Sequence, residues 1–163
     1  MADDVAVLRK RLRDVERDAA DLPWANDAKR GRRWTVATHV WWENDVPVVD
    51  LHDLGAAGAR SAVDAVLANP AEAGAVVFVH GRGKHSRGPQ VLHKVVQAEL
   101  ARACGAEAGW SFRTLGPGRT VWISDRSRAP ASVTGGWGCG LRLVFAGLLV
   151  AAAVALGHAA GWW

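Results

Sequence analysis

Two short apolar runs separated by an amphipathic segment constrain the fold of this chain more than any other feature. Residues 46–51 and 75–79 are rich in valine, and each is too short for a helix, which predicts two buried strands. Between them, residues 56–67 carry apolar side chains at helical spacing until Asn69 and Pro70 end the pattern. A strand, a helix and a strand in this order predict a right-handed crossover that joins parallel strands. The carboxyl ends of both strands should therefore meet at one edge of a sheet.

Charged and imidazole side chains follow both predicted strands. The first strand runs into Val49-Asp50-Leu51-His52-Asp53, and the second runs into His80-Gly81-Arg82-Gly83. Ligands of open α/β sheets bind beyond the carboxyl ends of the strands, where these groups lie. The edge is therefore the candidate site.

The loop after the second strand has the composition of a phosphate site. Its glycines permit close backbone approach, and its arginines and lysine supply positive charge. Pro89 then opens a second helical pattern, which Gly105 is predicted to cap. The N–H groups at the start of such a helix favour an anion. Residues 110–113 and 120–123 complete the domain as a predicted strand pair around a Gly-Pro-Gly turn.

The two motifs resemble those of the Smr (small MutS-related) domain, which carries an LDLHG-type motif on its first strand and HGxG after its second. The resemblance covers roughly residues 46–124. It implies an α/β fold, a small two-layer βαβαββ domain. This chain departs from the pattern at Asp53, where the family usually has glycine. A carboxylate at that position would either repel a phosphate or cap the following helix.

The resemblance implies an endonuclease or a nucleic-acid-binding module that acts on RNA, on branched or nicked DNA, or on ribosome-associated messages. We predict Asp50, His52 and His80 as catalytic residues. Asp50 would orient His52, and His80 or His85 would be its counterpart, with the assignment of base and acid open. The predicted phosphate-binding residues are Gly81, Arg82, Gly83, Lys84, His85 and Arg87.

A tightly bound metal is not expected. Asp50 and His52 offer two donors, but no third carboxylate lies in an obvious motif. We expect no tightly bound cofactor, with Mg²⁺ assisting through the nucleic acid. Cys104 and Cys139 are too few for a disulfide framework, which favours a reducing compartment.

Other functions compete with a nuclease. An Asp-x-His at a strand end is, taken alone, most often a structural pair, and the glycine loop lacks the third glycine of a dinucleotide site. The main alternative is a non-catalytic module that binds nucleic acid or a ribosome, and a third is a scaffold that works through the first helix. His39 and His93 are predicted at the surface.

The segments around the domain differ sharply in composition. Residues 1–20 form a predicted amphipathic helix with Val5, Leu8, Leu12 and Val15 on one stripe, and residues 21–45 a basic, tryptophan-rich linker. The cations and aromatic side chains of this linker could contact nucleic acid. Alternatively, the tryptophans pack on the domain and the cations are solvated. Residues 125–140 form a predicted flexible linker. The net charge of +4 agrees with a polyanionic partner, and arginines next to a membrane segment would also attract anionic lipid.

Residues 141–163 are predicted to be a transmembrane tail anchor. Every residue from Leu143 to Gly157 is apolar or glycine, and the run to Trp163 approaches the ~20 residues that cross a bilayer. Arg142 precedes the run and no lysine or arginine follows it, which predicts a single-pass membrane protein with its domain in the cytoplasm. The alternative is a helix buried against the domain or a partner chain. The oligomeric state stays open.

Overall fold

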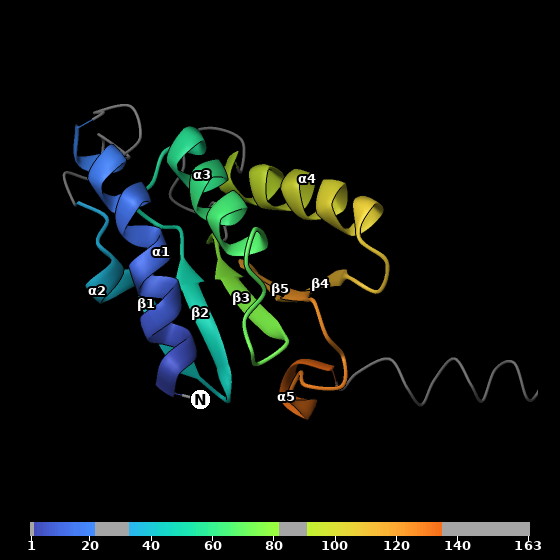
Figure 1. The fold of residues 1–163 in the computed structure, drawn as a ribbon. Helices are drawn as coiled ribbons and strands as arrows, with labels where there is room; N and C mark the ends of the chain where they lie inside the picture. Colours follow the sequence, from blue (N-terminus) through green and yellow to red (C-terminus); the bar gives the residue numbers. More distant parts are fainter. Residues whose placement is uncertain (1, 22–32, 82–90, 135–163) are drawn as a thin grey trace, which may run out of the picture. The chain divides into compact units, whose positions relative to one another are not determined.

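The parallel strand pair predicted from the sequence lies at the centre of a five-stranded sheet (Figure 1). The structure is a computed structural model, and it describes residues 2–21, 33–81 and 91–134. The strand order is β1-β2-β3-β5-β4, and only β2 and β3 pair in parallel. The strands are β1 (Val40–Glu43), β2 (Val46–Asp50), β3 (Ala75–Val79), β4 (Ser111–Gly116) and β5 (Arg119–Ile123).

The pairing register brings the two motifs to one edge of the sheet. Asp50, the last residue of β2, is opposite Val79, the last residue of β3. Arg119, the first residue of β5, is opposite Val79 on the other side. The turn that joins β4 to β5 therefore lies at the same edge as both motifs.

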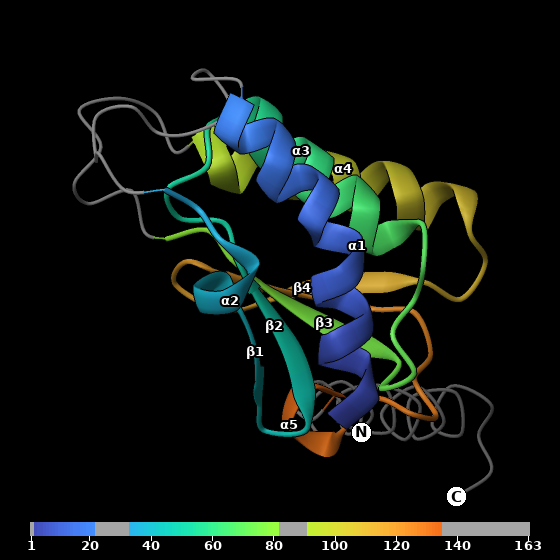
Figure 2. The same cartoon turned by 60° about the vertical axis from the view of Figure 1, so that its left-hand side comes forward.

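Helices lie against both faces of this sheet. One face is covered by α1 (Ala2–Asp21), α2 (Val36–His39), α3 (Ala56–Leu67) and α4 (Val91–Ala106), and α5 (Ala131–Thr134) lies against the other. Figure 2 shows α1 beside α3, which in turn packs on α4. α3 has the predicted bounds, and the order of strands and helices predicted for the domain is confirmed for β2 to β5.

Strand side chains alternate between two apolar clusters. Val49, Phe78 and Trp122 point to the face covered by α1, α3 and α4, and these three side chains are fully buried. The predicted apolar stripe of α1 belongs to the same cluster. Their neighbours Val48, Val77 and Val121 belong to a second cluster on the opposite face, which includes Val133 of α5. This packing fixes the strand register, because a slip of one residue would exchange the two sets.

Three sequence predictions are corrected, two on the flanking segments and one inside the domain. Residues 36–43, expected in a linker, form α2 and β1, because Asn44 and Asp45 adopt positive φ and close a two-residue hairpin onto β2. Residues 131–134, also expected in a linker, form α5, in which Val133 is buried. Gly105 lies inside α4, which ends at Ala106.

The predicted membrane anchor at 141–163 lies outside the described residues. Within the described ranges, no helix combines the length and apolarity that a membrane crossing requires.

Candidate active site

The ends of β2 and β3 bring His52 and Gly81 into direct contact. The amide of Leu51 donates to the carbonyl of Val79, 2.8 Å away, which extends the strand pairing toward the two motifs. Gly81 adopts a φ of +74°, and a Cβ atom there would lie 2.3 Å from Nε2 of His52. Any larger residue at position 81 would displace the imidazole. The predicted convergence of the two motifs therefore occurs at Gly81.

Asp50 orients His52 through two hydrogen bonds to one carboxylate oxygen. Oδ1 of Asp50 accepts from the backbone amide of His52 at 2.8 Å and from its Nδ1 at 2.5 Å. Both side chains are partly exposed, at 22% for Asp50 and 31% for His52. Because the carboxylate holds a proton on Nδ1, the nitrogen through which His52 exchanges protons is Nε2, beside Gly81.

His80 is buried behind this pair rather than exposed to solvent. His80 is only 5% exposed. Its Nδ1 lies 3.3 Å from the carbonyl oxygen of Gly81, and its Nε2 lies 3.0 Å from the hydroxyl of Thr120. Gln97 donates to the same hydroxyl at 3.2 Å, and the hydroxyl can in turn donate to Nε2 of His80 when Nδ1 carries the ring proton. Both ring nitrogens are therefore engaged by protein groups.

Burial lowers the pKa of His80. A hydrogen bond to the Gly81 carbonyl acts in the opposite direction, and the nearby rings of His93 and His52 lower the pKa further. The ring of His80 is thus uncharged at neutral pH. The amides of His80 and Gly81 both donate to the carbonyl of Gly118, at 2.9 and 3.2 Å, which fixes the start of the loop.

His93 and His39 are packed against this site, although the sequence placed both at the surface. Nδ1 of His93, in the first turn of α4, lies 3.5 Å from Nε2 of His80, with ring centroids 4.8 Å apart. Nε2 of His39 lies 3.5 Å from the Asp53 carboxylate. The local sequence does not predict these contacts, because each contact joins segments that are distant along the chain.

Asp53 neither caps α3 nor stands as an isolated carboxylate. The residue before α3 is Gly55, and no side chain caps the helix there. Asp53 has a φ of +69° and is 9% exposed. This conformation explains why glycine suits the position, and aspartate is one of the few other residues that adopts it.

Five of the predicted phosphate-binding residues lie outside the described residues: Arg82, Gly83, Lys84, His85 and Arg87. Their role stays a prediction. Within the described part of the chain, no group of three or more His, Cys, Asp or Glu side chains is arranged to hold a metal ion.

Residues 49–119 match the family model of the Smr domain. This part of the chain is an Smr domain. Searches of curated proteins and of solved structures found no match. The Smr domain suggests nucleic-acid binding or nuclease activity. It contains the Asp50–His52 pair and the start of the second motif, whereas Trp34 and His39 precede it.

Proposed function

We propose that this protein is an endonuclease that cleaves phosphodiester bonds in RNA or in structured or nicked DNA. The observation that carries the proposal is the Asp50–His52 hydrogen bond, in which Nδ1 of a partly exposed imidazole faces the carboxylate while Nε2 lies beside the Gly81 backbone. A histidine that is oriented by a carboxylate can both accept and release a proton near neutral pH.

In this mechanism His52 acts as the general base. Nε2 takes the proton from the attacking hydroxyl while the oxygen–phosphorus bond forms, and the bond from phosphorus to the leaving oxygen breaks. Asp50 stabilises the imidazolium, as carboxylates do in other base-activated sites. The leaving oxygen takes a proton from a second acid, for which the sequence offers His85.

His80 is better suited to support than to proton donation. Its ring is buried, its pKa is lowered by burial, and both nitrogens contact protein groups. We propose that it holds the Gly81 backbone, where the loop begins. The cations at 82, 84 and 87 would offset the charge that develops on phosphorus.

Substitution of Asp50 tests the mechanism in the full chain. Asp50→Asn retains the shape of the side chain but removes the charge that orients and stabilises His52, and we expect cleavage to slow by about 10²- to 10⁴-fold. Asp18→Asn, on the exposed side of α1, is the matched control. The assay uses labelled single-stranded RNA and branched DNA, with and without Mg²⁺, and melting curves confirm that both variants fold.

Undiminished cleavage by Asp50→Asn would remove the pair from the mechanism. Salt-dependent binding without cleavage by the wild-type chain would instead favour the alternative, a non-catalytic module that binds nucleic acid or a ribosome.

We also propose that residues 141–163 tether the protein to a membrane, with the Smr domain on the cytoplasmic side. The support is the unbroken apolar run from Leu143 to Gly157 and the position of Arg142 before it. Cleavage would then act on nucleic acid near the membrane surface.

A further inference from the structure

A segment that precedes the Smr domain contacts the His52 turn on both sides. Trp34 is fully buried, and its Nε1 donates to the backbone carbonyl of Asp50 at 2.7 Å. His39, at the end of α2, places Nε2 3.5 Å from Oδ2 of Asp53. The residues contacted, Asp50 and Asp53, enclose Leu51 and His52 in the sequence. Trp34 and His39 also lie near each other, with ring centroids 5.6 Å apart.

His52 and Asp53 are the central residues of one tight turn. The amide of Leu54 donates to the carbonyl of Leu51 at 3.2 Å, and both leucines are buried. A turn with positive φ at its third residue needs a residue that tolerates that conformation. Because His52 and Asp53 share this turn, a contact that fixes the Asp53 side chain also restricts the backbone that carries His52.

The neighbours of His39 favour a proton on Nε2. Nδ1 lies 3.2 Å from the Thr35 amide and 2.8 Å from the Thr38 hydroxyl, and when it accepts from either of them the proton of the neutral ring is on Nε2. In the charged ring, Nδ1 donates to the Thr35 carbonyl at 3.0 Å and Nε2 is also protonated. An N–H on Nε2 faces the Asp53 carboxylate. Both side chains are nearly buried, at 12% and 10% exposed, which limits competition from water.

We propose that Trp34 and His39 are positioning residues of the Asp50–His52 pair, so that residues 34–39 are part of the working site although they precede the Smr domain. Trp34 fixes the end of β2 through the Asp50 carbonyl, and His39 fixes the turn through Asp53. The catalytic consequence rests on the proposed nuclease function, whereas the effect on the His52 ring does not.

The test records the imidazole ¹⁵N spectrum of His52 in the full chain and, on the same samples, the rate of RNA cleavage. In the wild-type chain we expect one tautomer, with the proton on Nδ1. His39→Asn retains an amide near Thr35 but does not reach Asp53, and we expect mixed His52 tautomers and about tenfold slower cleavage. His39→Gln extends an amide toward Asp53 and should restore both signals.

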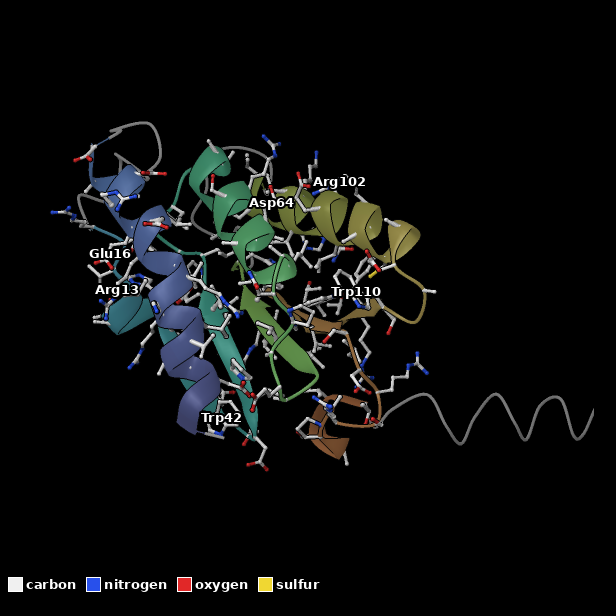
Figure 3. The ribbon with its side chains drawn as sticks, in the orientation of Figure 1. Arg13, Glu16, Trp42, Asp64, Arg102 and Trp110 are labelled. Carbon is white, nitrogen blue, oxygen red and sulfur yellow. The ribbon has the colours of Figure 1, made fainter. Side chains whose placement is uncertain are left out.

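Two further variants change the contact partner of His39 and the second positioning residue, Trp34. Asp53→Asn tolerates positive φ but lacks the charge, so its effect and that of His39→Asn should not add in the double variant. Trp34→Phe removes the donor to Asp50. Trp110→Phe is its matched control, because Trp110, just before β4, packs on Trp122 of β5, away from the strand ends that carry the site (Figure 3).

An unchanged His52 spectrum in His39→Asn, Asp53→Asn and Trp34→Phe would overturn the inference. A shifted spectrum in a chain that cleaves no nucleic acid would support the positioning role and refute the nuclease. The two failures are therefore distinguishable.

Discussion

At the scale of single residues, Asp53 shows how a departure from a family pattern can keep the backbone and change the contacts. The turn after β2 requires positive φ, which glycine adopts most easily and aspartate tolerates. The sequence allowed two roles for the carboxylate, repelling a phosphate or capping α3. In the structure it faces His39 instead. An imidazole nitrogen thereby faces the carboxylate from the protein side of the turn.

The buried ring of His80 predicts a loss of stability as the pH falls below neutrality. Burial lowers the pKa of His80 in the folded chain, while the unfolded chain takes up the proton near pH 6.5. Protons therefore favour the unfolded state once the pH falls through about 6.5, and the stability is fully present only above that value. Urea unfolding of the wild type and of His80→Gln at pH 5.5, 6.5 and 7.5 measures the effect. The wild type should show the steeper decline, and equal slopes would contradict the assignment.

At the scale of elements, an ion network joins α3 to α4 across the outer surface of the helical layer. Arg60 of α3 contacts Glu99 of α4 at 2.9 Å, and Arg102 of α4 contacts Glu99 at 3.0 Å. Arg102 also contacts Asp64 of α3 at 2.9 Å (Figure 3). Burial alone would raise the pKa of Glu99, but the hydrogen bonds from Arg102 and Arg60 outweigh it and lower the pKa. The stability that Glu99 supplies is thus present above its ordinary pKa and is lost as the pH falls through the lowered one.

We expect Glu99→Gln to lower the free energy of unfolding by about 1 kcal/mol at pH 7, because pairs of this exposure contribute little each. The difference from the wild type should shrink on acidification to pH 3. Glu107→Gln, at an exposed position after α4, is the control. Chemical unfolding followed by circular dichroism measures both. A deficit that persists unchanged at pH 3 would show that packing, rather than charge, is lost.

The elements also differ in how far the sequence predicts them. α3 is predicted to the residue because a regular apolar stripe and a proline stop define it. β1 was missed because Trp41, Trp42 and Glu43 suggest a polar, aromatic linker unless Asn44-Asp45 is recognised as a hairpin turn. The burial of Trp34 depends on a hydrogen bond to Asp50, sixteen positions away, which local periodicity does not encode.

At the scale of the whole molecule, the topology made the location of the site predictable. The side-chain contacts around the site were not predictable from the sequence. The crossover rule alone places Asp50 and His80 at one sheet edge, and the pairing of β2 with β3 confirms it. The contacts of His80 with Thr120 and His93 depend instead on how α4 and β5 pack over that edge. Such details arise from side-chain packing between distant segments, so the sequence assigned His80 to catalysis without indicating its burial.

The last prediction concerns where the whole chain resides. An apolar run of this length should insert into a bilayer, so the full chain should sediment with membranes and resist alkaline extraction. Leu148→Lys with Val154→Lys adds two charges to the run, each costing about 2.5–3.5 kcal/mol near the bilayer centre, and should release the chain to the supernatant. Val7→Lys, on the exposed side of α1, is the matched control. Alkaline release of the unmodified chain would refute the anchor and favour a helix that packs on protein instead.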